Sequence, residues 1–349
     1  MFSAGIRGYS GARGMLGALR AREPKQPIVE ELLNQPDAAA AFNHLRSMPF
    51  LAGIASGDKP VEIERDLRYG CVLFGKKLAD FTGGAAQKFL KTYLLHYEVH
   101  NLKALFRRAL AGKAEARTDD LYPVAPVYSS ASRVGALSTP ERVVALAEKT
   151  RLEGAVKTAY GEYQANTGDL FRFDLSLDRE LMLMLWSAAE RTGPVESWRL
   201  KQVILMPLLG TRALVWGLWL KHYHGMSAQE IMGVLLVPSG LIDAEVFIAT
   251  IQAEDMRQAA EAVSFEPLKE FLAETGVPED IVSWQRLLRR FVWGRVAKRD
   301  MGMIFDAATL MREILRWEHV VEDAITVASG KSLEMGREDI VPLLATQAA

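Results

Sequence analysis

The sequence has few of the features that mark secreted, nucleic-acid-binding or disordered chains. Its 349 residues contain a single cysteine, Cys71, so no disulfide can form within the chain and a reducing compartment is expected. Its 42 basic and 43 acidic residues leave a formal net charge of −1, which gives no overall attraction to nucleic acid or to an anionic membrane. Because 49% of the residues are hydrophobic and 24% are charged, the chain can form packed cores and differs in composition from a disordered protein.

Acidic residues are absent from the first 22 positions, and this absence allows two interpretations. Four arginines give the stretch the composition of a mitochondrial presequence: Arg7, Arg13, Arg20 and Arg22. Tyr9, Leu16 and Leu19, with one of these arginines between them, keep the i, i+3/i+4 spacing of a helix. We therefore expect a first structural helix here rather than a presequence.

Long hydrophobic runs are also rare, and only residues 203–220 approach the length of a membrane span. Arg212 lies near the centre of this run, where a charge costs about 2.5–3.5 kcal/mol on insertion scales. Pro207 and Gly210 interrupt the run as well. We expect a buried core helix, and a protein that reaches a membrane only through a partner.

Motifs of catalysis and cofactor binding are missing or incomplete. Residues 329–332, Ser-Gly-Lys-Ser, imitate the end of a phosphate-binding loop, but Ile325 stands where that loop needs glycine. Gly83-Gly84 lacks the third glycine of a dinucleotide fingerprint, and Cys71 has no evident base beside it. We predict no catalytic residue and no cofactor.

Metal and nucleic-acid sites have only weak signals. His96 and His100 are i, i+4 neighbours that could chelate a metal, but no third ligand is evident on that face, so no metal is predicted. A basic run towards the C-terminus could bind nucleic acid, but it has few interleaved aromatic residues, and a solvated helix face or a protein interface explains it better. This run contains Arg286, Arg289, Arg290, Arg295, Lys298 and Arg299.

Strand patterns are almost absent, and amphipathic helical patterns dominate. Helices are expected at about 27–46, 60–80, 85–111, 139–164, 178–192, 197–223, 227–236, 243–263, 266–274, 278–298 and 304–329. Capping residues support these limits: Thr139-Pro140, the Ser227–Glu230 capping box and Pro278 at helix starts. Gly112, Gly225 and Gly330 suit left-handed caps at helix ends. The fold class is therefore all-α.

The chain repeats weakly with a period near 110 residues. Four landmarks keep the same order three times: Phe50, Tyr160 and Phe271; Glu64-x-x-Leu67, Asp174-x-x-Leu177 and Trp284-x-x-Leu287; Asn101, Leu214 and Asp323; Leu121, Ile231 and Ile340. A unit of this length exceeds the solenoid repeats of about 20–50 residues, so it is a small helical domain used three times. With a boundary in the Pro- and Ser-rich stretch 119–138, we predict modules at 1–117, 118–226 and 227–349.

The most informative segment is residues 93–108, because a polar residue interrupts its apolar stripe. Leu94, Tyr97 and Leu105 recur at helical spacing, yet Asn101 lies on the same face. A buried amide without partners costs about 1–3 kcal/mol, so such a residue usually fixes a geometry. The pattern acid-x-x-Asn-Leu-Lys-x-Leu-x-Arg, which runs here from Glu98 to Arg107, resembles the signature of the C/d subunit family of V-type and A-type ATPases.

The resemblance implies a fold and a role. The family's fold is three related helical modules of about 110 residues arranged as a funnel around a pseudo-threefold axis. Its members are non-catalytic rotor subunits that couple the central stalk, through the stalk's D and F subunits, to the membrane rotor ring. The implied location is the cytoplasmic face of a membrane, held there through the ring. The signature residues act as an interface or a structural brace: Glu98, Asn101, Leu102, Lys103 and Arg107.

The other two copies depart from the signature. Leu214 replaces the asparagine in the second copy, where Thr211 replaces the acid. In the third copy Asp323 is close to asparagine, but Val320 replaces the acid. Two alternatives stay open: a helical scaffold with unrelated partners, and a small-molecule enzyme with a pocket between helices. Adjacent genes for rotary ATPase catalytic and ring subunits would favour the rotor role over both alternatives.

Overall fold

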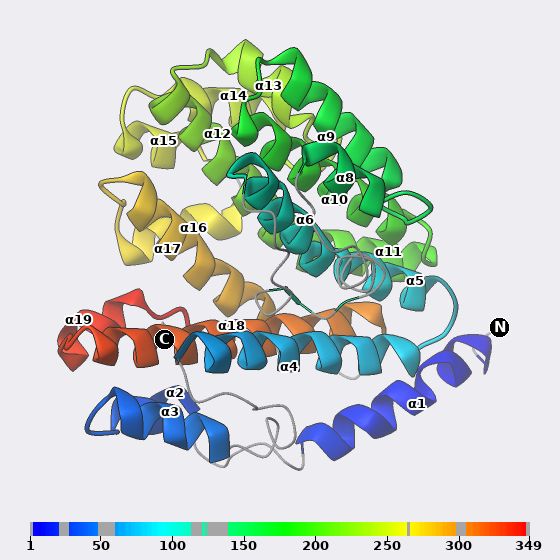
Figure 1. Cartoon of the computed structure of the whole chain (residues 1–349), viewed down its shortest axis with the longest axis vertical. Helices are drawn as coiled ribbons and strands as arrows, with labels where there is room; N and C mark the ends of the chain where they lie inside the picture. The colour runs from blue at the N-terminus through cyan, green and yellow to red at the C-terminus, as the bar shows by residue number, and fades with distance from the viewer. Residues whose placement is uncertain are drawn as a thin grey trace. The chain divides into compact units, whose positions relative to one another are not determined.

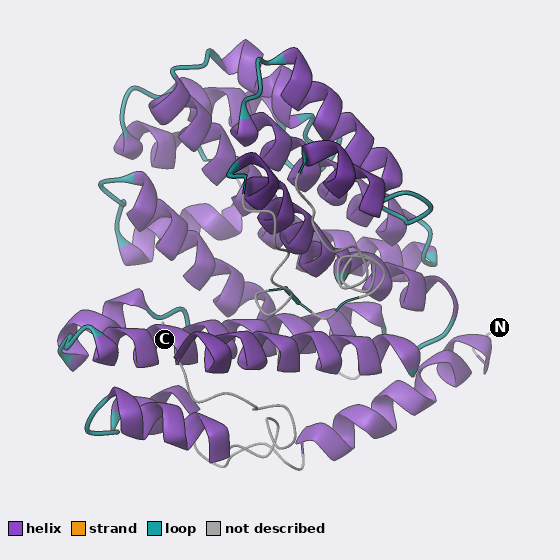
Figure 2. Cartoon of the chain, viewed as in Figure 1, coloured by secondary structure: helices purple, strands orange, loops and turns teal. Residues whose placement is uncertain are grey.

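The computed structural model describes residues 3–20, 28–47, 60–112, 121, 122, 124, 139–263, 266–297 and 305–346. Over these residues the chain forms helices and no strand, as Figure 2 shows. The all-α prediction is therefore confirmed for the part of the chain that the structure describes.

The helices follow the predicted ranges, with several runs divided in two. The run 27–46 forms α2 (Ile28–Leu33) and α3 (Ala38–Ser47), and 85–111 forms α5 (Gly84–Tyr93) and α6 (Leu95–Leu110). The run 139–164 forms α8 (Pro140–Leu146) and α9 (Glu153–Ala165), and 243–263 forms α14 (Ala244–Gln252) and α15 (Met256–Ala262). Internal caps explain two of the breaks, since Asp37 accepts from the Ala40 N–H and Asp255 from the Gln258 N–H.

The remaining helices agree closely with the sequence patterns, apart from one helix start. They are α1 (Ser3–Arg20), α4 (Pro60–Asp80), α10 (Leu170–Glu190), α13 (Ala228–Leu235), α16 (Glu266–Thr275), α17 (Ile281–Val292) and α18 (Ala307–Ser332). The short α19 (Arg337–Ile340) lies beyond the last predicted range. Helix α10 begins earlier than the predicted 178. Short π- and 3-10 segments follow α17 and α19: η3 (Trp293–Ala297) and η4 (Val341–Leu343).

The apolar run at 203–220 lies inside a continuous helical stretch. It comprises α11 (Pro194–Arg199), the π-helical η2 (Leu200–Gly210) and α12 (Thr211–His224). By length and composition this is the one helix among the described residues that could cross a membrane, and 61% of its most apolar window is buried within the protein. The Thr211 hydroxyl donates to the Pro207 carbonyl at 2.6 Å, beside the proline that interrupts the ladder. Trp219, expected in the core, is 39% exposed.

Four predictions about helix ends were right and two were wrong. Thr139 and Pro140 begin α8, and Gly112 follows the end of α6 with φ +66°. Gly225 ends α12 with φ +63°, and Ser227 and Glu230 form both bonds of the capping box. Asp280, rather than Pro278, lies at the start of α17, where its carboxylate accepts from the Ser283 N–H. Gly330 lies inside α18: a Cβ there would lie 2.7 Å from Ile340 Cγ1, so close packing explains this glycine.

Contacts divide the chain into two compact units. The first comprises residues 1–87 and 189–349, and the second comprises residues 88–188. This division is defined by contacts, whereas the modules 1–117, 118–226 and 227–349 are defined by repetition. The three modules and their funnel arrangement therefore stay predictions.

A hydrophobic core of the first unit lies around the long helix α18, which packs against α2, α3 and α4 (Figure 1). Asp306 begins α18 by accepting from the Thr309 N–H at 3.0 Å. Helix α1 belongs to this unit, because Tyr9 donates to Glu196, and Arg20 pairs with the buried Glu313 at 2.5 Å. These contacts favour the structural helix over the presequence interpretation.

The second unit has its own core, formed by apolar side chains of α6, α8, α9 and α10. The rings of Phe106 and Phe173 stack at its centre with centroids 3.8 Å apart. Leu102 is fully buried in the same core, so one signature residue is a packing residue.

Candidate functional site

The five signature residues all lie on α6. Leu102 packs in the core of the second unit, and the other four are polar residues whose contacts are described below. Helix α6 begins at Leu95 and ends at Leu110, where Gly112 follows with φ +66°. Glu98 and Asn101 are buried, whereas Lys103 and Arg107 point to a more exposed side.

Asn101 binds the backbone of a distant residue through both ends of its amide. Its Nδ2 donates to the Tyr122 carbonyl at 2.7 Å, and its Oδ1 accepts from the Tyr122 N–H at 2.8 Å. The side chain is completely buried, and this pairing satisfies one donor and one acceptor on each partner. The Tyr122 ring lies edge-on to the ring of Tyr97, with centroids 5.1 Å apart, so an aromatic contact also joins Tyr122 to α6.

Lys103 and Arg107 form an ion-pair ladder to α10. Lys103 Nζ lies 2.5 Å from Asp178 Oδ1, and Arg107 Nη2 pairs with Asp174. Burial raises the pKa of Asp174, and the two cations oppose that shift. The two cations and the two carboxylates are each spaced i, i+4, which is a sequence signal that could have identified Asp174 and Asp178 as partners.

Glu98 is the one signature residue whose charge has no matching hydrogen bonds. The residue is 6% exposed, and its Oε2 has no hydrogen-bond partner. Burial raises the pKa of this carboxyl to about 7, with the Arg151 guanidinium opposing the shift. Near neutral pH the carboxyl is therefore close to half protonated, which limits the cost of burying it.

Asp323 repeats the action of Asn101 in the third predicted copy. It is completely buried, and it accepts from the N–H groups of Ala345 and Thr346 at 3.1 and 2.7 Å. Arg289 Nη2 donates to the same carboxylate at 2.8 Å. Asn101 binds the backbone 21 residues downstream, and Asp323 binds the backbone 22 and 23 residues downstream. The two residues, which the 110-residue period places at matching positions, therefore have the same kind of partner.

The residues that gave weak signals for metal or nucleic-acid binding make contacts within the protein. His96 Nδ1 lies 2.8 Å from the Tyr93 carbonyl, and the His100 ring packs edge-on to Tyr122. Among the described residues, no group of three or more His, Cys, Asp or Glu side chains is placed to hold a metal ion. In the basic run, Arg290 donates to the carbonyls of Pro342 and Leu344, while Lys298 and Arg299 lie outside the described residues.

The arrangement on α6 can hold helices and backbone segments in fixed positions, and it contains no constellation of nucleophile, base and electrophile. It defines a helical protein whose most distinctive polar residues organise its own interior. A family model described as the ATP synthase (C/AC39) subunit matches residues 14–341. The chain belongs to this family, which supplies the AC39/d component of V-type and A-type ATPase complexes. A search of curated proteins finds no match.

Proposed function

We propose that this chain is the non-catalytic rotor subunit that couples the central stalk of a V/A-type rotary ATPase to the membrane rotor ring. ATP hydrolysis or synthesis takes place in other subunits, and torque passes through this one. The observation that carries the proposal is the family match over residues 14–341, which includes the signature on α6 and parts of all three predicted modules.

A rotor coupling must transmit torque without yielding, and the described helices have the packing and polar contacts of a stiff body. The 26-residue helix α18 is buried along much of its length against several other helices of its unit, among them α2, α3 and α4. The amide of Asn101 and the carboxylate of Asp323 each fix a backbone segment to a long helix. Close packing of this kind resists deformation, which supports a mechanical role.

The proposed partners are the ring subunit on one side and the D and F subunits of the stalk on the other. The chain reaches the membrane only through the ring, at the cytoplasmic face. The near-neutral net charge of −1 supports this, because it offers the chain no general attraction to anionic lipid. We expect the chain to sediment with membranes when it is co-expressed with ring and stalk subunits, and to remain apart from membranes when it is expressed alone.

The signature on α6 acts as an internal brace rather than as a partner contact. Asn101 and Leu102 are completely buried, so neither can touch another subunit without unfolding of the unit around it. Lys103 and Arg107 are more exposed, but both pair with α10. A partner must therefore recognise other surfaces of the chain.

Deletion of the gene tests the proposal. We expect membranes from the deletion strain to retain ATP hydrolysis while ATP-driven ion transport falls to background, because the stalk loses its connection to the ring. The control is complementation with the unaltered chain and with Asn43→Leu, a change at an exposed position of α3. Tightly coupled transport in the deletion strain would overturn the proposal and favour a helical scaffold with unrelated partners.

A further inference from the structure

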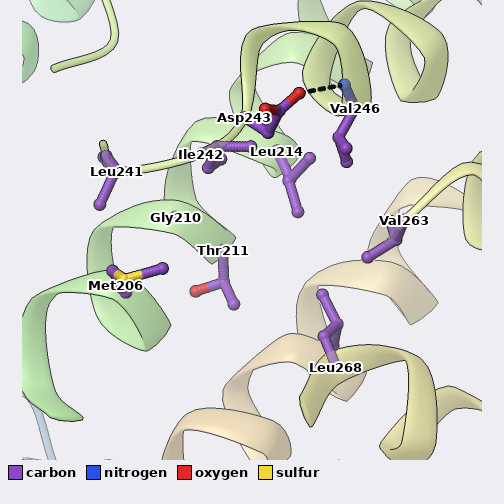
Figure 3. Close-up of a pocket in the computed structure, with 10 residues that line it drawn as sticks. All are labelled: Met206, Gly210, Thr211, Leu214, Leu241, Ile242, Asp243, Val246, Val263 and Leu268. Atoms are coloured by element: carbon purple, nitrogen blue, oxygen red, sulfur yellow. Dashed lines mark hydrogen bonds between the residues drawn. The ribbon is translucent and has the colours of Figure 1, made fainter. Parts of the chain in front are cut away.

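An apolar pocket lies in the first unit, away from the signature on α6. It has a volume of about 190 Å³ and is lined by side chains of η2, α12, α14 and the segments around them (Figure 3). The apolar side chains of the lining are Met206, Leu214, Leu241, Ile242, Val246, Val263 and Leu268. In Figure 3 the side chains of Leu214 and Val246 both point towards the middle of this space.

The polar groups of the pocket are already committed to the protein. The Thr211 hydroxyl donates to the Pro207 carbonyl at 2.6 Å. Asp243 is exposed and caps α14, with its Oδ1 accepting from the N–H groups of Glu245 and Val246 at 2.9 and 3.2 Å. A ligand therefore meets hydrocarbon on most sides, and the one carboxylate of the lining is already bound by two backbone N–H groups.

Comparison with the other long helices explains why this wall of the pocket is apolar. Gly210 stands in the register of Tyr97 on α6 and His319 on α18, at the same separations, 113 and 109 residues, that relate Leu214 to Asn101 and Asp323. On α6 and α18 that face carries a ring and a polar side chain that binds the chain's own backbone. Gly210, at the end of η2, and Leu214, on α12, occupy these positions. Ile242 covers Gly210, since a Cβ there would lie 3.5 Å from Ile242 Cγ1, and Leu214 presents only hydrocarbon to the pocket.

We propose that this pocket binds an uncharged hydrocarbon group of about the size of benzene, either a free small molecule or the end of a lipid acyl chain. The pocket is partly open to solvent and lined mostly by hydrocarbon, so a ligand that fills it removes apolar surface from water. An apolar cavity of about 150 Å³ lined by similar side chains stays dry and binds benzene or xenon in a well-studied case. This inference goes beyond the rotor function and does not depend on it.

The test uses the full chain, with two probes that separate the two sources. Benzene represents the free hydrocarbon, and dodecylphosphocholine below its critical micelle concentration represents the acyl chain. A ligand that binds only the folded state stabilises it by RT ln(1 + [L]/Kd), so the melting temperature rises with ligand concentration, and we expect a rise of about 2–4 °C when the concentration is about ten times Kd. A rise with benzene alone identifies a site for free small molecules, and a rise with both extends it to acyl chains; no rise with either overturns the proposal.

Two variants locate the effect. Val246→Phe fills the pocket and should abolish the rise, whereas Val282→Phe adds the same bulk at a position 52% exposed on α17 and should leave it intact. Equal shifts in both variants would place binding elsewhere and overturn the proposal. Should the filled variant fail to fold, xenon diffraction from the unaltered protein decides: xenon within the lining of Figure 3 supports the site, and its absence there overturns it.

Discussion

At the scale of single residues, Glu98 makes the stability of the protein depend on pH. Burial raises the pKa of its carboxyl from 4.5 to about 7, so between these pH values the folded chain binds a proton that the unfolded chain has lost. The free energy of unfolding therefore falls as pH rises through this interval. The difference, 7 minus 4.5, corresponds to about 3 kcal/mol, fully lost by about pH 8.

Glu98→Gln tests this dependence, because glutamine has nearly the same shape and does not ionise. We expect the variant to lose the decline in stability between about pH 4.5 and 7, and to exceed the unaltered protein by about 2–3 kcal/mol at pH 8. Denaturant unfolding across this pH range measures both. Glu274→Gln, at an exposed position of α16, should keep the decline, and an unchanged slope in Glu98→Gln would contradict the assignment.

Asn101→Leu tests the brace directly, since Leu214 already occupies the matching position in the second predicted copy. The substitution leaves the Tyr122 N–H and carbonyl without their partners, and we expect a loss of about 1–3 kcal/mol in unfolding free energy. Chemical denaturation of the free chain is the measurement. Asn43→Leu changes an exposed asparagine of α3 and should cost far less. Unaltered stability combined with weaker binding of stalk subunits would mean that the signature is an interface after all.

At the scale of helices, the approach of α19 to α18 depends on one glycine. A Cβ at Gly330 would lie 2.7 Å from Ile340 Cγ1 and 2.9 Å from Ile340 Cδ1, and Ile340 is itself buried. We expect Gly330→Ala to lower the unfolding free energy by about 1–3 kcal/mol, because the clash outweighs the better helix propensity of alanine.

A double-mutant cycle separates this clash from other effects. In the Ile340→Ala background the obstructing atoms are gone, so Gly330→Ala should cost less there than in the unaltered chain. Gly233→Ala is the matched control, because a Cβ at that position of α13 meets nothing within 4 Å. It should be neutral or stabilise the chain by up to about 1 kcal/mol. Equal costs of Gly330→Ala in both backgrounds would contradict the packing explanation.

At the scale of the whole molecule, the two compact units should respond separately to these changes. Each has its own hydrophobic core, one around α18 and one among α6, α8, α9 and α10. Local opening follows such cooperative units. We expect Asn101→Leu to reduce hydrogen-exchange protection within residues 88–188, and Gly330→Ala to reduce it in the other unit. Protection lost equally across the chain in both variants would show that the units open together.

Local patterns in the sequence were enough to predict most of the helices and the family. Apolar periodicity and capping are local properties, so α4, α13 and α18 could be placed from spacing and from residues such as Ser227 and Glu230. The motif from Glu98 to Arg107 is also local, and it identified the family that the match over 14–341 shows. The start of a helix was predicted less accurately where two capping residues lie close together, as Pro278 and Asp280 do before α17.

Only the tertiary structure decided what the conspicuous residues contact. An amide within an apolar stripe indicates that a partner exists, but the partner of Asn101 is the backbone of Tyr122, 21 residues away across a stretch with no periodic pattern. The burial that raises the pKa of Glu98 and the close approach of Ile340 to Gly330 likewise arise from segments that meet in space. Periodicity specifies which face of a helix turns inward; the residues that face it are fixed by packing between helices distant in sequence.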